Sequence, residues 1–181
     1  MGTATTPDKI KPFAAITFAP EARVAEVTSA LVRFFGPVDF SYGPVPFDFT
    51  DYYGDEMGKG LTKMYLTFET QAEREALADV KVFTNDLERR YAAKGRRTVN
   101  IDPGYIAADK LVLASTKDFY HRVYLSQGIF AEVTLHYRKG IYRFFSWTFP
   151  DYREPAFLEF LQRVRARYVK TVRDAHESQR G

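Results

Sequence analysis

The sequence of 181 residues contains no cysteine, only three histidines and a single tryptophan. The lack of cysteine excludes disulfides, thiol nucleophiles, iron–sulfur clusters and cysteine-ligated zinc. No run reaches the roughly 18 apolar residues that a membrane helix needs, and the N-terminus lacks the apolar core of a secretory signal peptide. The sequence therefore predicts a cytoplasmic protein with no membrane partner.

The residues that are present favour a folded domain. Apolar residues make up 45% of the chain, and 26 Lys and Arg nearly balance 23 Asp and Glu, a composition unlike that of a disordered chain. The net charge of +3 gives no broad basic surface of the kind that binds nucleic acid. The length fits one domain, expected over residues 12–174 between a flexible N-terminal segment (1–11) and a polar tail (175–181).

Hydrophobic periodicity predicts an α+β fold. Period-2 alternation and short apolar runs predict strands, and three- to four-residue spacing of apolar side chains predicts helices. The expected strands are 13–19, 38–42, 64–68, 96–102, 110–114, 119–125, 129–137 and 141–147, and the expected helices are 20–36, 70–95 with a break at 82–85, and 155–174. The first half has the β-α-β-β-α-β order of the ferredoxin-like fold, extended by an antiparallel β-meander and a C-terminal helix. Pro103-Gly104 is expected to form a turn that closes the fourth strand.

The first hairpin of the meander predicts a pairing across its two strands. A three-residue loop at Ser126-Gln127-Gly128 places Leu125 opposite Ile129 and Arg122 opposite Glu132. This register keeps polar and apolar side chains on separate faces, whereas a two-residue loop mixes them.

The second hairpin extends this pattern. A two-residue turn at Lys139-Gly140 places Leu135 opposite Phe144, so that Leu135 and His121 are expected on the apolar face. A histidine among apolar neighbours is either a satisfied core residue or a base, and both interpretations stay open. The other face is expected to gather polar side chains and the rings of Tyr124, Phe130, Phe145 and Trp147.

Familiar catalytic and nucleotide motifs are missing. Residues 54–60 (GDEMGKG) are one residue too short for a phosphate-binding P-loop and lack its final hydroxyl. Thr116-Lys117-Asp118 lacks one residue of the guanine-reading motif of GTPases. Gly-x-Ser-x-Gly and His-Glu-x-x-His are absent as well. Conventional GTPase, serine hydrolase and zinc protease chemistry is therefore not expected.

Seven polar strings, taken together, resemble a known family. They are residues 46–60, 83–85, 100–105, 110–118, 121–122, 131–134 and 147–152. Over residues 12–173 the chain is similar to a bacterial family of unknown function whose members are sometimes labelled "GTP-binding protein". The resemblance implies no established reaction, and the label is not carried over because the P-loop is missing. The resemblance implies that Asp151, and the eight candidate residues named in the next paragraph, lie in strings that this chain shares with the family.

Charged residues in the middle of the chain predict a pocket for a small anionic, phosphorylated molecule. Ligand binding is expected from Lys117, Arg122 and Glu132, acid–base catalysis from Asp102, Asp118 and His121, and magnesium binding from Asp48 and Asp51. Lysine and arginine would neutralise the ligand, while carboxylates would hold magnesium or act as a base. Alternatively, these carboxylates only keep a surface loop solvated.

Two further functions stay open. The aromatic sheet face would suit a non-enzymatic protein-interaction module, which predicts an exposed apolar patch. RNA binding on a ferredoxin-like sheet is a weaker alternative, because Ile141 stands where the RNA recognition module has a stacking aromatic residue.

Overall fold

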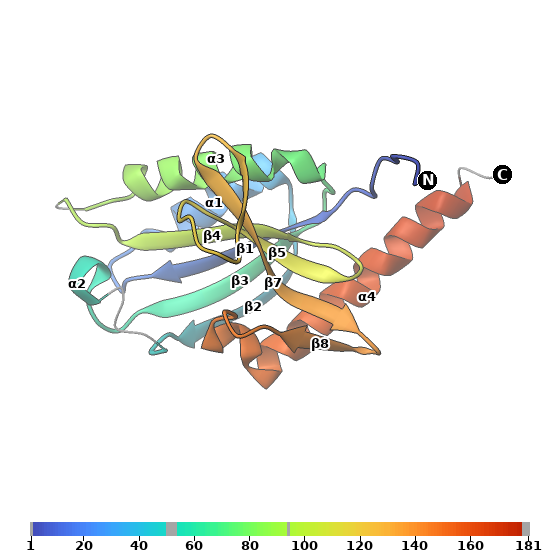
Figure 1. The fold of residues 1–181 in the computed structure, drawn as a ribbon. Coiled ribbons are helices and arrows are strands. Elements are labelled where there is room, and N and C mark those ends of the chain that lie inside the picture. The colour runs from blue at the N-terminus through green and yellow to red at the C-terminus, as the bar shows by residue number, and fades with distance from the viewer. Residues whose placement is uncertain (1, 50–53, 94, 179–181) are drawn as a thin grey trace.

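The computed structural model describes residues 2–49, 54–93 and 95–178 and is built around a sheet of eight strands (Figure 1). The strands are β1 (Lys11–Phe18), β2 (Val38–Pro46), β3 (Thr62–Phe68), β4 (Val99–Ile106), β5 (Lys110–Ser115), β6 (Val123–Ser126), β7 (Ile129–Arg138) and β8 (Ile141–Phe144). The helices are α1 (Val24–Phe35), the single turn α2 (Gly54–Met57), α3 (Leu77–Arg90) and α4 (Pro155–Ser178), and short 3₁₀ turns are η2 (Arg74–Ala76) and η3 (Pro150–Arg153). The fold is therefore mixed α and β, with a C-terminal helix, as the periodicity predicts.

Helices cover both faces of the sheet (Figure 1). Leu31 of α1 and Leu87 of α3 pack with Ile101 of β4 in one buried cluster. Phe157 of α4 packs on Phe13 in a second cluster. Since Phe13 and residues of the first cluster alternate along β1, the two clusters lie on opposite faces. The α4 helix covers only part of its face, and the rest is open to the candidate site.

All strand pairs are antiparallel, in the order β2-β3-β1-β4-β5-β7-β6, and β8 pairs with the other end of β7. The expected turn at Pro103-Gly104 is wrong, because β4 continues through both residues to Ile106. Both residues pair with β1, opposite Ala14 and Phe13. The turn at this end of β4 follows at residues 107–109.

Pro103 explains where β4 and β5 separate. The two strands pair only at Gly104, Tyr105 and Ile106 of β4. Backbone groups of alternate residues point to the same neighbouring strand, so Pro103 occupies a position that faces β5 together with Ile101 and Tyr105. Proline has no N–H to donate to a ladder, and the pairing with β5 ends there. Beyond this point β4 and β5 diverge and leave an opening in the sheet.

Gly104 permits the close approach of β5 at the last paired position. A Cβ atom built on Gly104 would lie 2.1 Å from the carbonyl oxygen of Val112. We therefore expect Gly104→Ala to lower the free energy of unfolding by about 1–3 kcal/mol, because backbone must shift to make room. Urea unfolding followed by circular dichroism measures the effect. Gly2→Ala is the matched control, since nothing lies within 4 Å of its added Cβ; equal midpoints for the two variants would contradict the argument.

The first hairpin reaches the expected pairing by a different route. Its loop has two residues, Gln127 and Gly128, both with positive φ, and Ser126 lies opposite Ile129, so the expected three-residue loop is wrong. A bulge at Leu125 then shifts the register by one residue. Val123 consequently lies opposite Ala131 and Tyr124 opposite Phe130, as the sequence predicts. The Lys139-Gly140 turn and the Leu135–Phe144 pair are confirmed.

A second bulge, in β7, moves Leu135 to the opposite face from the one expected. Val112 of β5 pairs with Val133 and the next β5 residue toward the N-terminus pairs with Leu135, which leaves Thr134 as the extra residue. Glu132 and Leu135 therefore share one face although they are three residues apart. Leu135 joins the core under α4, and Glu132 points into the open part of the same face.

Element boundaries differ at the ends of the chain. Ile10 is buried and bridges to Ala72, and β1 begins at Lys11, so ordered structure starts before residue 12. The α4 helix continues to Ser178, past the expected end of the domain. The expected break at 82–85 is wrong, because α3 is continuous through it. None of the helices in the described ranges is long and apolar enough to cross a membrane.

Candidate functional site

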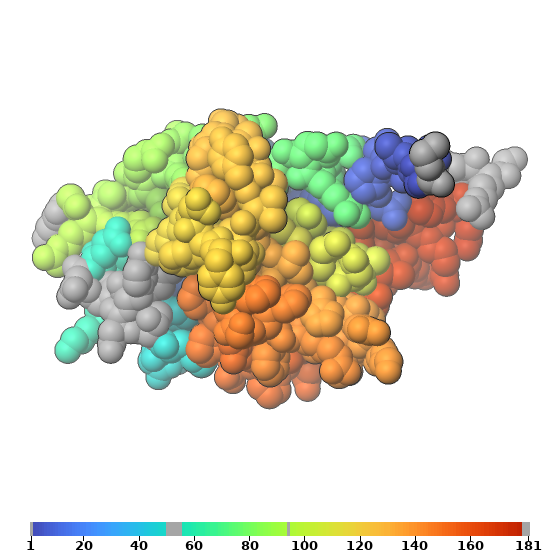
Figure 2. Space-filling view, viewed as in Figure 1, coloured from blue at the N-terminus to red at the C-terminus, as the bar shows by residue number. Residues whose placement is uncertain are grey.

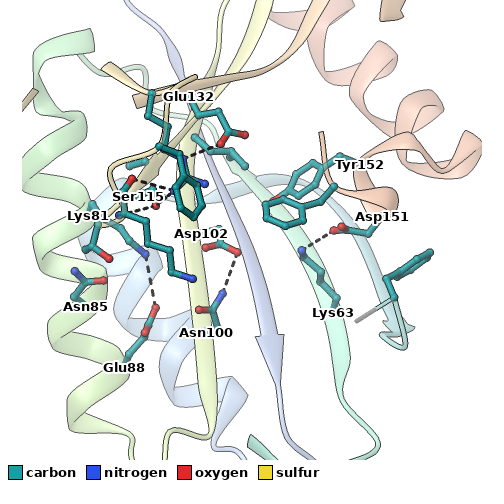
Figure 3. A pocket seen from close by; sticks show the side chains of 18 of the residues that line it. Lys63, Lys81, Asn85, Glu88, Asn100, Asp102, Ser115, Glu132, Asp151 and Tyr152 are labelled. Atoms are coloured by element: carbon teal, nitrogen blue, oxygen red, sulfur yellow. Dashed lines mark hydrogen bonds and ion pairs between the residues drawn. The ribbon is translucent and has the colours of Figure 1, made fainter. Parts of the chain in front are cut away.

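A pocket of about 420 Å³ lies at the opening between β4 and β5. It is lined by Phe47, Phe49, Lys63, Lys81, Asn85, Glu88, Arg97, Asn100, Asp102, Leu113, Ala114, Ser115, Thr116, Lys117, Phe119, Arg122, Glu132, Phe149, Pro150, Asp151 and Tyr152. Figure 3 shows polar side chains from α3, from β4 and from β3 converging on the same space. In Figure 2 the segment between β5 and β7, yellow to light orange, lies in front of the rest of the molecule.

Lys81 and Glu88 of α3 complete the backbone hydrogen bonds of β4 at the opening. The ammonium Nζ of Lys81 donates to the carbonyl oxygen of Ile101 at 2.8 Å. The backbone N–H of Ile101 donates to Glu88 Oε1 at 2.7 Å. These side chains thus bind the groups that β5 would have paired, had the strands stayed together.

Arg97 joins three elements on this side of the pocket, which forms its first wall. Its guanidinium donates to Glu88 of α3 (2.8 Å), to Asn100 of β4 (2.8 Å) and to Glu56 of α2 (2.7 Å). Burial alone would lower the pKa of Arg97, but the hydrogen bonds to Glu56 and Glu88 outweigh it and raise that pKa. Arg97 therefore stays charged and ties α2 to the sheet.

Burial raises the pKa of the Glu88 carboxyl, and the nearby charge of Lys81 and the hydrogen bond from Arg97 offset the effect only in part. The folded state thus favours the protonated carboxyl more than the unfolded state does. This contribution to stability is fully present below the unfolded-state pKa and is lost as the pH rises through the raised pKa.

We therefore expect the wild-type protein to lose stability relative to Glu88→Gln as the pH rises from about 4 to about 8. Glutamine keeps a hydrogen-bond acceptor for Ile101 and removes the titration. Denaturant unfolding at several pH values measures the difference. Glu159→Gln, at an exposed position of α4, is the control and should follow the wild type. Wild-type stability that stays constant or rises relative to Glu88→Gln over this pH range would overturn the assignment.

A buried ion pair forms the opposite wall. Lys63 Nζ lies 2.6 Å from Asp151 Oδ2, and each side chain is only 5% exposed. The Tyr65 hydroxyl donates to the same oxygen at 2.9 Å. Burial, together with the negative charge of Asp151, raises the pKa of Tyr65, which keeps its proton for this bond. The contact fastens η3 to β3 across the sheet.

Glu132 organises the third wall. Its Oε2 accepts from Arg122 Nε and contacts His121 Nε2, each at 3.0 Å. The guanidinium of Arg122 also donates to the Ser115 hydroxyl (2.8 Å) and to the carbonyl oxygen of Lys117 (3.0 Å). The turn after β5 is thereby held against β7, and the expected proximity of Arg122 and Glu132 is confirmed.

From the sequence, His121 is expected on the apolar face, but its ring faces a carboxylate and packs against aromatic side chains. Its side chain is 9% exposed, faces Glu132 and stacks on Trp147 with ring centroids 5.0 Å apart. Trp147 stacks in turn on Phe145 at 4.6 Å and donates its indole N–H to Val133. Two rings of the expected aromatic face, Phe145 and Trp147, thus stack on each other within the protein. Trp147 also holds His121 against Glu132.

Residues 8–168 match a protein family described as a domain of unknown function, DUF4416. The chain belongs to this family. No curated protein and no solved structure matches the chain. The family description carries neither the GTP-binding label nor the bacterial origin that the resemblance implied.

In this DUF4416 domain, four of the candidate residues line one pocket: Asp102, Lys117, Arg122 and Glu132. His121 reaches the pocket through Glu132. Asp102 accepts a hydrogen bond from the Asn100 amide at 2.9 Å, and none of the cationic groups described forms an ion pair with it. Their catalytic and binding roles stay predictions.

The remaining candidates lie elsewhere. Asp118 and Asp48 are exposed and do not line the pocket, although Phe47 and Phe49 on either side of Asp48 do. Asp51 lies outside the described residues. Within the described ranges, no three histidine or carboxylate side chains lie close enough together to hold a metal ion. Magnesium at Asp48 and Asp51 stays a prediction.

The sequence patterns did not predict three charged residues of the DUF4416 pocket, Lys63, Lys81 and Glu88. Lys81, Asn85 and Glu88 follow one another at helical spacing beside the apolar stripe of α3, a pattern that could have indicated a polar face turned inward. Lys63 lies on the same face of β3 as the buried Tyr65, and its sequence context gives no comparable indication.

Proposed function

We propose that the pocket binds a small anionic molecule carrying a phosphate group. The observation that carries the proposal is the turn after β5, where Ser115, Thr116 and Lys117 line the pocket beside Arg122. Hydroxyl, ammonium and guanidinium donors on one short wall are the groups that recognise phosphate oxygens. A volume of about 420 Å³ lies within the range of small-molecule sites.

The charges of the pocket support the same proposal. Glu88, Glu132 and Asp151 each contact a cationic side chain of the site. Lys117 adds an exposed positive charge at the rim. An incoming anion would therefore meet these three acids already paired with cations, one further carboxylate at Asp102, and a cation that is accessible from solvent. Asp102 would serve as the base toward the bound molecule.

We infer that the first four strands have the ferredoxin-like arrangement. The order β2-β3-β1-β4 with antiparallel neighbours supports it, as does the packing of α1 and α3 on one face. The pocket would then lie where this unit meets the added meander.

A thermal-shift screen with phosphorylated metabolites, with and without magnesium, tests the proposed function. We expect stabilisation of the wild-type protein, and a loss of affinity of about tenfold in Lys117→Ala, because one charge-assisted hydrogen bond is removed. Lys170→Ala, which removes an exposed lysine of α4, is the matched control and should bind as the wild type does. Lack of stabilisation by every compound in the panel would overturn the proposal.

One observation favours a second function, protein interaction. All residues of β6 are exposed, among them Val123, Tyr124 and Leu125, and β6 is the last strand of its sheet edge. An exposed apolar edge strand suits pairing with a strand of another chain. Light scattering of the wild type and of Val123→Lys would detect self-association; identical monomer masses at all concentrations would count against pairing of two copies.

A further inference from the structure

Exposed aromatic side chains are gathered around the mouth of the pocket. Phe49, Phe119 and Phe149 line it and are all exposed, although they come from three separate segments of the chain. Single exposed hydrophobic residues are common on protein surfaces and need no explanation. Three phenylalanines around one cavity that also holds charged side chains are a different case, because a bound molecule would remove all of them from water together.

Two of these segments place an aromatic ring directly beside a cation of the pocket. The guanidinium carbon of Arg122 lies 4.7 Å from the centre of the Phe119 ring. Across the pocket, Lys63 Nζ lies 4.9 Å from the centre of the Phe47 ring, which is 5.9 Å from that of Phe49. The cations are thus anchored at depth, and the apolar surface continues from them toward the solvent.

From this juxtaposition we propose that the ligand is a phosphate monoester whose substituent is a planar ring, held between the phenylalanines at the mouth while the phosphate contacts Lys117 and Arg122. The inference rests on the proposed function and narrows it to one class of molecule. Stacking of a planar ring on phenylalanine adds dispersion and quadrupole attraction to simple burial. A sugar or aliphatic phosphate would gain little of this and would leave the aromatic rings in water.

Phenyl phosphate and methyl phosphate test the inference, because they carry the same charged group and differ only in the ring. We expect phenyl phosphate to bind at least about tenfold more tightly in calorimetric titration, in line with ring stacking in other sites. Phe149→Ala should remove most of this preference and leave the affinity for methyl phosphate unchanged. Phe144→Ala is the matched control, because Phe144 is 53% exposed and Phe149 52%, and Phe144 lies outside the pocket.

The possible outcomes separate the two proposals. Equal affinity for the two esters would overturn the ring preference and leave phosphate binding in place. A ring preference that survives in Phe149→Ala would also overturn it, because Phe149 would then not take part in holding the ring. Failure of both esters to bind the wild-type protein would overturn the proposed function together with this inference.

Discussion

Asp151→Ala is expected to lower the free energy of unfolding by about 3–5 kcal/mol, because it leaves the ammonium group of Lys63 buried without its counter-charge. Lys63 and Asp151 are 2.6 Å apart and almost fully buried, and Tyr65 donates to the same carboxylate. The substitution therefore also leaves the Tyr65 hydroxyl without its acceptor. Denaturant unfolding monitored by circular dichroism gives the value.

Two further experiments show whether the loss of stability arises from the unpaired ammonium group of Lys63. Removing both charges with Lys63→Met and Asp151→Leu should recover most of the lost stability, since a buried pair replaced by apolar residues is often neutral. Asp109→Ala breaks an exposed pair with Lys110 and should cost no more than about 1 kcal/mol. If Asp151→Ala is as mild as Asp109→Ala, the pair is not buried in solution as described.

Phe157→Ala is expected to destabilise the protein by about 3–5 kcal/mol through the cavity it leaves. Phe157 is fully buried at the start of α4 and contacts the rings of Phe13, Tyr65 and Tyr152. Because these rings belong to β1, β3 and η3, the substitution tests the packing of α4 against the sheet. Thermal and urea unfolding would both report it.

The corresponding control is an exposed phenylalanine. Phe144→Ala should change stability by no more than about 0.5 kcal/mol, since Phe144 lies on the surface of β8. A small effect of Phe157→Ala would mean that α4 is not docked on the sheet, and the description of the second core would have to be abandoned.

Much of the fold follows from periodicity alone. The stripe of Leu77, Val80, Thr84, Leu87 and Tyr91 predicts α3. The first four side chains are buried, whereas Tyr91 is half-buried and follows the last residue of the helix. Alternation places most of the strands, and the turn residues Lys139-Gly140 fix one hairpin register. These features depend on residues that are close in the sequence, so they can be predicted without knowledge of tertiary contacts.

The features that depend on distant partners could not be predicted in this way. Pro103-Gly104 has the composition of a turn, and pairing of both residues with β1, and of Gly104 with β5, keeps them in a strand. The bulge at Thr134 inserts one residue without any mark in the alternation of β7, and it decides which face Leu135 occupies. His121 contacts Glu132 from a turn at residues 119–122, where the alternation of the expected strand does not hold, so its polar surroundings could not be inferred from the pattern.

The candidate site shows the same division. The charges of Lys117, Arg122 and Glu132 are evident in the sequence. The predicted hairpin register also places Arg122 opposite Glu132, and the two side chains are hydrogen-bonded. Lys63 and Glu88 enter the site only through tertiary packing of β3 and α3. Their charges are tolerated because each has an oppositely charged partner, Asp151 far along the chain for Lys63 and Arg97 nine residues on for Glu88.

The way in which α3 closes the opening in the sheet has a consequence for solubility. Where β4 leaves β5, Lys81 and Glu88 hold the N–H and C=O of Ile101 that face the gap. A strand from a neighbouring molecule would find no free donor or acceptor at that residue, so the gap cannot easily seed intermolecular β-pairing. The same two side chains that shape the pocket thereby protect the protein from aggregating through it.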